Sequence, residues 1–273
     1  KLNRRRQAEE IQVIADGPPR NTSVIIYDNG EGQHPEKFET TFLSLVKGNK
    51  INIQFVQGKY NMGGSGALVF CGKKRYQLIA SKRYDGTGNF GFTLIRQHRI
   101  SDSGFNRRSS HFEYLKINNQ IPNFPIEYLD LHLYDRNFKT GSVIKMYSYQ
   151  FPSGYSGFAQ DLHQSLNEFM FEPVLPILTV DKKERYPNNK VLELDLFGLK
   201  RRLEDVGSEY IDTYFSESYV DELFGKAKVT CYVFKPKTEK NDVKKSKEII
   251  RSRFFKNNMS VMFSINGQVH GSY

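Results

Sequence analysis

Two glycine-rich clusters, about thirty-five residues apart, constrain the fold of this chain more than any other feature of its sequence. The first cluster, residues 28–32 (DNGEG), ends a β-branched and apolar run that begins at Ser23. The second, residues 58–66 (GKYNMGGSG), precedes the apolar residues 67–70. A strand that ends in a carboxylate and a glycine turn, followed by a row of bare amides, indicates a nucleotide pocket. The first cluster would contact the base and the second the phosphates.

The first cluster is compatible with two local structures. A DNG tripeptide after a β-branched run is a strong signal for a hairpin turn. The residues that follow favour a helix instead, because Pro35 and Glu36 suit a first helical turn and apolar residues recur at helical spacing over residues 38–46. A strand–turn–helix unit places Asp28 at the end of a sheet, where its carboxylate can accept a hydrogen bond from an exocyclic amine.

The second cluster can bind an anion through successive backbone N–H groups, more strongly if a helix starts at Ala67. Lys47, Lys50 and Lys59 are close in sequence and can bring positive charge to phosphate oxygens. A flexible surface loop explains the same glycines equally well. The cluster is not a Walker A loop, because no Gly-Lys-Ser/Thr follows at the required spacing.

The two clusters, in this order and with a helix between them, resemble the GHKL ATPase superfamily. Its members include the gyrase B subunit, heat-shock chaperones, histidine kinases, MutL and the MORC proteins, and the motif layout here is nearest to MORC-like, MutL-like and chaperone-like members. The resemblance implies that Asp28 binds adenine, that residues 140–144 (TGSVI) support it through Ser142, and that a glycine lid covers the phosphates. The residues that it assigns to ATP are Asp28, Gly30, Gly32, Lys50, Gly63, Gly64, Ser65, Gly66, Ala67 and Ser142.

One motif of that superfamily has no match in this chain. The family carries a helix with ExxxN, whose Glu activates water and whose Asn holds Mg²⁺, before the adenine-binding aspartate. Here Glu9 is followed four positions later by Val13, and Glu10 by Ile14. We therefore expect the chain to begin inside a domain and to contain no catalytic residue and no metal ligand. The resemblance still implies ATP and Mg²⁺ as cofactors of an ATPase.

We predict an α+β fold with two domains. Residues 1–150 would form a Bergerat-type α/β sandwich, a mixed sheet with helices on one face. After a composition shift at residues 151–157, residues 158–273 would form a smaller α/β domain that resembles a transducer domain, incomplete at its C-terminus, with the phosphate-contacting lysine beyond Tyr273. A helix is expected over residues 162–170. Strands are expected at residues 11–15, 24–27, 76–81, 90–96, 111–117, 141–149 (the last of the first sheet), 191–197, 226–234 and 259–265.

The net charge of +10 admits DNA as a partner, although a solvated basic surface has the same composition. Residues 235–258 hold nine lysines and arginines, which fit a disordered insertion, a solvated helix or a DNA-contacting face. No apolar run is long enough to span a membrane, so no membrane partner is expected. The two cysteines, Cys71 and Cys231, predict free thiols in a reducing cytoplasm and are too few for a structural zinc site.

Together these features predict an ATP-binding and ATP-hydrolysing conformational switch in a DNA-linked repair or defence complex, with a homodimer formed through the ATPase domain. Two alternatives fit the same sequence features. The first is a protein-remodelling chaperone of the same superfamily, and the second is a nucleotide- or nucleic-acid-binding module without hydrolysis.

Overall fold

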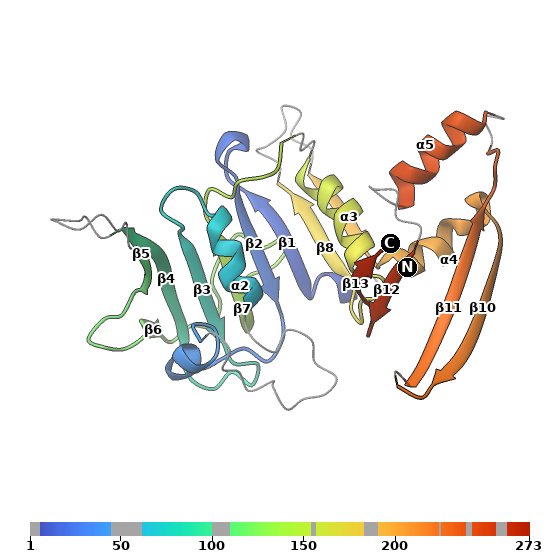
Figure 1. The fold of residues 1–273 in the computed structure, drawn as a ribbon. Helices are drawn as coiled ribbons and strands as arrows, with labels where there is room; N and C mark the ends of the chain where they lie inside the picture. The colour runs from blue at the N-terminus through green and yellow to red at the C-terminus, as the bar shows by residue number, and fades with distance from the viewer. Residues whose placement is uncertain are drawn as a thin grey trace, which may run out of the picture. The chain divides into compact units, whose positions relative to one another are not determined.

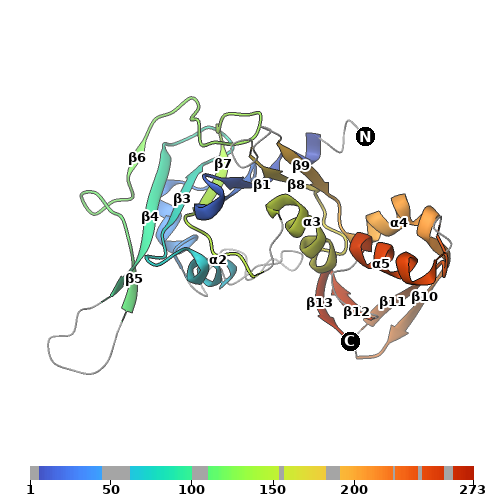
Figure 2. The same ribbon diagram turned by 90° about the horizontal axis from the view of Figure 1, so that it is seen from above.

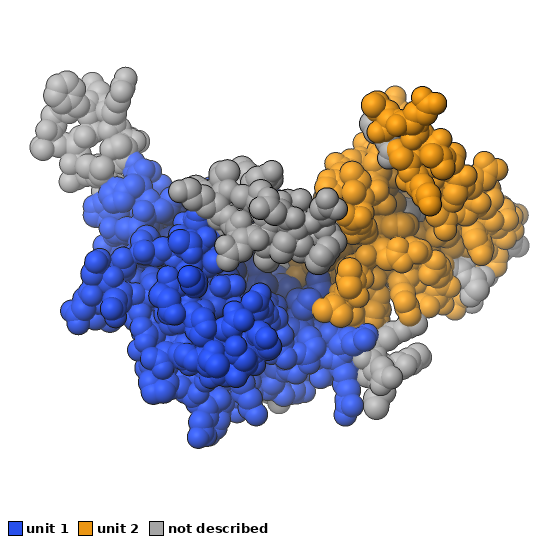
Figure 3. Space-filling model, turned by 90° about the horizontal axis from the view of Figure 1, so that it is seen from below, with its two compact units in different colours: residues 1–161, 177–195 blue, residues 162–176, 196–273 orange. Residues whose placement is uncertain are grey.

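The computed structural model describes residues 6–44, 62–99, 110–153, 157–182, 191–223, 225–238, 242–254 and 261–273. The chain divides into two compact units, coloured separately in Figure 3. The first unit comprises residues 1–161 and 177–195, and the second comprises residues 162–176 and 196–273. This division differs from the predicted boundary near residue 150, because residues 177–195 return to the first unit as strands of its sheet.

Within the described residues, the first unit contains a nine-stranded sheet of order β5-β4-β3-β7-β2-β1-β8-β9, with β6 paired to β4 (Figure 1). The sheet is mixed, because β1 pairs in parallel with β8 whereas β2, β3, β4, β5, β6 and β7 join through antiparallel pairs. The strands are β1 (Ile11–Asp16), β2 (Ser23–Asp28), β3 (Gln77–Lys82), β4 (Phe90–Arg99), β5 (Ser110–Tyr114), β6 (Asn123–Phe124), β7 (Gly141–Met146), β8 (Ile177–Asp181) and β9 (Leu192–Leu196).

The structure confirms the α+β class and the predicted antiparallel pairs β1–β2 and β3–β4. The prediction that residues 141–149 form the last strand of the sheet is wrong. Strand β7 lies in the middle, between β2 and β3, and the sheet continues past β1 to β8 and β9. The central place of β7 explains its burial on both faces, which local alternation of residue types does not reveal.

Each face of this sheet carries its own apolar cluster. On one face, Phe38, Leu68, Ile79, Ile95 and Ile121 are buried together. On the opposite face, the buried residues include Ile25, Tyr27, Ala80, Phe90, Phe138 and Val143, covered by residues 126–138, which form no helix. The helical segments that follow the two glycine clusters therefore pack on the first face only.

Those helical segments differ from the prediction. Residues 35–40 form a 3₁₀ helix, η2 (Pro35–Thr40), instead of the start of a longer α-helix, and it ends in a turn over residues 41–43. Phe38 is fully buried and stacks edge-on against Phe42, with 5.1 Å between ring centroids, so the apolar spacing is satisfied by a turn. Another short 3₁₀ helix, η1 (Pro19–Asn21), connects β1 to β2.

The second glycine cluster also differs from its predicted form. Residues 62–67 form a short α-helix, α2 (Met62–Ala67), followed by the 3₁₀ turn η3 (Leu68–Phe70). The glycine-rich loop that was predicted here is therefore helical from Met62 onward, and no helix starts at Ala67, because α2 ends at that residue. Leu68 is buried against the sheet and fixes this segment, whereas Val69 and Phe70 remain about half exposed.

Among its described residues, the second unit contains most of helix α3 (Phe158–Phe169), two further helices and two hairpins. The buried residues of its apolar cluster are Leu199, Leu203, Tyr210, Ile250 and Phe254. Of its elements, α4 and β10 were not predicted, whereas strands were predicted at residues 226–234 and 259–265, and a helix was one of three interpretations of residues 235–258. The elements are α4 (Leu199–Tyr210), β10 (Ile211–Asp221), β11 (Gly225–Phe234), α5 (Val243–Phe254), β12 (Met262–Ile265) and β13 (Gln268–Ser272), and helix α3 (Phe158–Phe169) precedes β8. None of the described helices is long and apolar enough to cross a membrane.

Substitution of Phe138 tests how much the core of the first unit contributes to stability. It is fully buried, and its ring lies 6.2 Å from that of Tyr27 and 5.5 Å from that of Phe90. We expect Phe138→Ala to lower the free energy of unfolding by about 3–5 kcal/mol, measured by urea denaturation. Phe112→Ala, at a side chain that is 49% exposed, should cost no more than about 0.5 kcal/mol. Equal effects of the two changes would contradict this core.

Candidate functional site at the end of strand β2

Asp28 is the last residue of β2, and its position is set by the register of the central strands. Asp28 lies directly opposite Ser142 of β7, and Ser142 lies directly opposite Ser81 of β3. Residues that face each other across antiparallel strands project from the same side of a sheet. The three polar side chains therefore share the face on which Ile79 and Leu68 pack.

The glycines of the first cluster shape a tight turn around the Asp28 carboxylate. The backbone N–H of Gly30 donates a hydrogen bond of 3.0 Å to Asp28 Oδ1. Gly32 has a φ of +64°, and a Cβ there would lie 2.1 Å from the carbonyl oxygen of Lys82. Gly141 has a φ of +96°, and a Cβ there would lie 2.0 Å from the carbonyl oxygen of Asp28. Both positions thus require glycine, for conformation and for space.

The hydroxyl of Ser81 organises the floor beside Asp28. It donates to the carbonyl oxygen of Gly141 at 2.7 Å, accepts the Gln33 N–H at 2.8 Å, and lies 3.3 Å from the Ser142 hydroxyl. Ser81 is fully buried and Ser142 is 7% exposed. The Ser142 hydroxyl that was predicted to support the aspartate is thus held in place by a second serine, which no sequence motif singled out.

A second network fixes the turn from the other side of the strand end. Asn29 donates its side-chain N–H to the Glu10 carboxylate at 2.6 Å, and Thr140 donates its hydroxyl to Asn29 Oδ1 at 3.2 Å. Arg136 contacts the Glu10 carboxylate at 3.3 Å and the Tyr27 hydroxyl at 3.2 Å. The loop before β7 and the turn after β2 are thereby tied together.

These contacts explain why the pKa of Glu10 is lowered. Burial would raise its pKa, but hydrogen bonds from Asn29 and Arg136, together with the charge of Arg136, outweigh burial and lower it. The guanidinium of Arg136 also lies 5.6 Å from the centre of the Tyr27 ring. Glu10 and Arg136 are positioning residues that sequence reasoning missed. They are 126 positions apart, so no local spacing could have paired them.

The glycines that the resemblance assigns to a phosphate lid are Gly63, Gly64 and Gly66, and they lie on α2. This helix leads into Leu68, which packs on the same face of the sheet as Asp28. Gly63, Gly64 and Gly66 are exposed, and a Cβ at any of them would meet nothing within 4 Å. Ala67 is half-buried, and Leu68 anchors the segment in the cluster with Ile79. Figures 1 and 2 show α2 alongside the central strands of the sheet. Leu68 thus places this segment on the same face of the sheet as Asp28.

Several predicted residues lie outside what the structure describes. Lys50, with Lys47 and Lys59, falls in residues 45–61, and the side chain of Ser65 is likewise not described. Among the described residues, no three His, Cys, Asp or Glu side chains gather where they could hold a metal ion. Cys71 is buried and Cys231 half-buried, and both are free thiols, as predicted.

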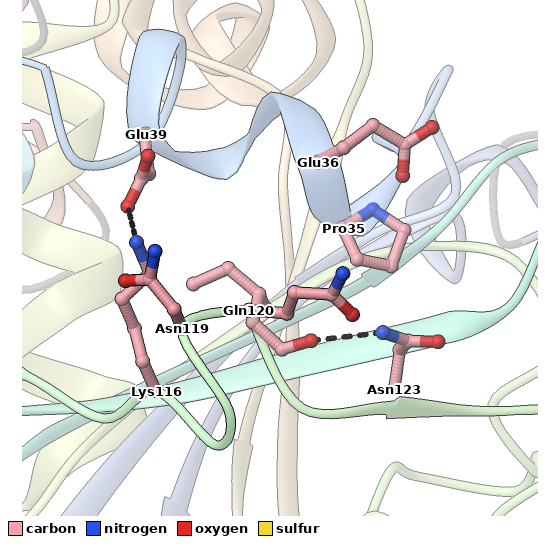
Figure 4. A pocket seen from close by; sticks show the side chains of 8 residues that line it. Pro35, Glu36, Glu39, Lys116, Asn119, Gln120 and Asn123 are labelled. Atoms are coloured by element: carbon pink, nitrogen blue, oxygen red, sulfur yellow. Dashed lines mark hydrogen bonds and ion pairs between the residues drawn. The ribbon is translucent and has the colours of Figure 1, made fainter.

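A separate cavity of about 310 Å³ lies beside η2 and is lined mainly by polar groups (Figure 4). Lys116 forms an ion pair of 2.7 Å with Glu39, and Asn123 donates to the Ile121 carbonyl at 2.8 Å. Neither Asp28 nor Ser142 lines it. Because its Lys116 and Glu39 satisfy each other, this cavity offers a ligand less unpaired charge than its composition suggests.

No protein-family model matches the chain, and no curated protein matches it in sequence.

Alanine substitutions at two glycines distinguish the cost of a left-handed backbone from the cost of a steric clash. Gly32 and Gly86 both have left-handed φ values, +64° and +72°, but a Cβ at Gly86 would meet nothing within 4 Å. We expect Gly86→Ala to cost about 1 kcal/mol of stability from backbone strain alone. Gly32→Ala should cost at least about 2 kcal/mol more, because the Lys82 carbonyl must also move. Urea denaturation of both variants measures the difference, and equal losses would show that the turn has room at Gly32.

The lowered pKa of Glu10 predicts that the free energy of unfolding depends on pH. Its pKa is lowered below the ordinary value of 4.5 in the folded protein, so its stabilising effect is present above that value and is lost as the pH falls through the lowered pKa. Wild type should exceed Glu10→Gln in unfolding free energy at neutral pH by no more than about 1 kcal/mol, since the side chain is partly exposed. The difference should vanish in acid. A difference that does not change with pH would rule out this role for the charge.

Proposed function

We propose that this protein binds ATP at the end of β2 and uses it as a conformational switch of the GHKL type. In this proposal the adenine amine donates to Asp28, Ser142 supports the aspartate, and the phosphates lie against the lid segment on α2. The described sheet, with helical segments on one face, supports a Bergerat-type arrangement for the first unit.

The observation that carries the proposal is the shared face of Asp28, Ser142 and the lid segment. A carboxylate at a strand end, over a buried hydroxyl pair and a turn of obligatory glycines, presents fixed acceptors beside exposed backbone. A flat base can approach such a turn closely because Gly30 and Gly32 have no side chains. Had the register placed Asp28 on the opposite face, it would project among Tyr27 and Phe138, away from α2.

The lid glycines add a second argument. Glycine in a helix costs about 1 kcal/mol relative to alanine, and α2 contains three of them among six residues. Packing does not require them, since the space where each Cβ would lie is open. Bare backbone at exposed positions is what an approaching phosphate needs, so phosphate binding accounts for glycines that packing leaves unexplained.

The part that the described residues play is to bind and orient the nucleotide. Asp28 selects a base with an exocyclic amine, and the networks through Ser81 and Glu10 hold its strand end in place. Closure of the lid segment on the phosphates would then order neighbouring loops, as γ-phosphate contacts do in other switches.

We also propose that the switch acts in a DNA-linked repair or defence complex, as a homodimer formed through its nucleotide-binding unit. The net charge of +10 supports a polyanionic partner. A chaperone-type ATPase of the same superfamily is the alternative, and it would be distinguished by stimulation of turnover with an unfolded client instead of DNA.

Asp28→Asn is the direct test. Asparagine keeps the shape and can still accept the Gly30 N–H, so the turn should fold, but the charged acceptor for adenine is removed. We expect ATP affinity, measured by isothermal titration calorimetry, to fall by about 1.5–3 kcal/mol, or roughly ten- to hundredfold.

Asp135→Asn serves as the matched control. It makes the same chemical change at a residue with a φ of +48°, a conformation that asparagine tolerates as well as aspartate. ATP affinity should be unchanged in this variant. Equal affinity of wild type and Asp28→Asn, or equal losses in both variants, would overturn the assignment of the pocket.

A further inference from the structure

Helix α5 has two sides of opposite character. Ser246, Ile250 and Phe254 recur at helical spacing and are 0%, 7% and 2% exposed, so one side is packed into the core of the second unit. The opposite side is exposed and basic. Over twelve residues the helix carries five basic side chains and one acidic side chain, Glu248. The basic residues are Lys244, Lys245, Lys247, Arg251 and Arg253.

The helix is anchored so that its basic side has a fixed direction. Asp242 accepts the N–H groups of Lys244 and Lys245 at 2.9 and 3.1 Å and thus caps the helix. The Ser246 hydroxyl accepts the Thr238 N–H at 3.0 Å, which ties the helix to the segment after β11. Arg253 lies 4.9 Å from the centre of the Tyr210 ring, so its guanidinium is also positioned.

On the neighbouring helix α4, carboxylates neutralise two of the basic side chains. Lys200 pairs with Glu172 at 2.6 Å and Arg201 pairs with Asp205 at 3.6 Å. By contrast, no carboxylate among the described residues lies within 4.0 Å of the amino groups of Lys244, Lys245 or Lys247. The positive charge of α5 is therefore concentrated and left without acidic partners at its exposed lysines.

We propose that the exposed basic side of α5 is a docking surface for the phosphate backbone of duplex DNA. A twelve-residue helix is about 18 Å long, and duplex DNA carries one charge per about 1.7 Å of its axis. The helix therefore spans roughly ten phosphates of a duplex lying along it. Flexible lysines contact phosphates without reading bases, so the surface binds DNA independently of sequence. This inference rests on the DNA part of the proposed function and deepens it by naming the surface that contacts DNA.

The test uses the full chain and a fluorescein-labelled duplex DNA about two helical turns long. Fluorescence anisotropy at several salt concentrations compares wild type with a triple variant, Lys244→Ala, Lys245→Ala and Lys247→Ala. Alanine favours helix, so the fold should be kept, which circular dichroism checks. We expect the dissociation constant to rise at least tenfold. The slope of log affinity against log salt should become shallower by about two to three, roughly one for each phosphate that a lysine no longer neutralises.

The control variant removes the same charge elsewhere, with Lys37→Ala, Lys73→Ala and Lys74→Ala at exposed positions of the first unit. It should bind DNA within about twofold of wild type. The proposal is overturned if both triple variants lose affinity equally, which indicates a diffuse charge effect, or if neither does. It is also overturned if phosphatidylserine vesicles bind through the α5 lysines more tightly than DNA. Asp28→Asn should bind DNA like wild type in the absence of nucleotide, so failure of the nucleotide site and failure of this surface give different results.

Discussion

The pairing of β2 with β7 is the constraint on which the candidate site depends. Side chains alternate between the faces of a sheet, so a slip of one residue would move Asp28 to the opposite face. The two apolar clusters prevent that slip, since Ile25, Tyr27 and Val143 fill one face while Ile144 packs toward the other. The packing of the core therefore determines the geometry of the site.

The strand end is held more rigidly than a surface turn usually is. The backbone approaches so closely at Gly32 and Gly141 that no other residue fits, and hydrogen bonds to Ser81 and to Glu10 fix the turn from two sides. Such contacts limit the movement of the Asp28 backbone before any ligand binds. A carboxylate placed in this way is preorganised for a hydrogen-bonding partner.

Local patterns predicted much of this fold, and its long-range features escaped them. Alternation and turn residues located β1, β2, β3 and β4 with their hairpins, because these signals lie within the strands themselves. The central place of β7 and the parallel pairing of β8 depend on contacts between distant segments, which no local pattern records. Strand β10 was missed because nearly all its residues are exposed and show no apolar alternation.

Some residues of the candidate site were likewise predicted from local patterns, and others are revealed only by tertiary contacts. Asp28, Gly30, Gly32 and Ser142 were found from a turn signal and a resemblance, and the structure brings them together. Ser81, Glu10 and Arg136 contribute through tertiary contacts and have no sequence signature of their own. The basic residues of α5 were visible as a charge run, but their separation onto one side of a helix became visible only with the buried side assigned.

The two halves of the candidate site differ in local stability, and that difference suits a switch. The Asp28 half belongs to the central strands, where the backbone is paired on both sides. The lid half is a helix of six residues with three glycines, far below the length at which helices are stable by themselves. Its hold on the sheet comes from Leu68, whereas the glycines before it leave open space where a side chain would lie. Segments with few buried contacts open at low free-energy cost. In the proposed function, a nucleotide bound at the Asp28 turn would therefore reorder the α2 segment before the central strands.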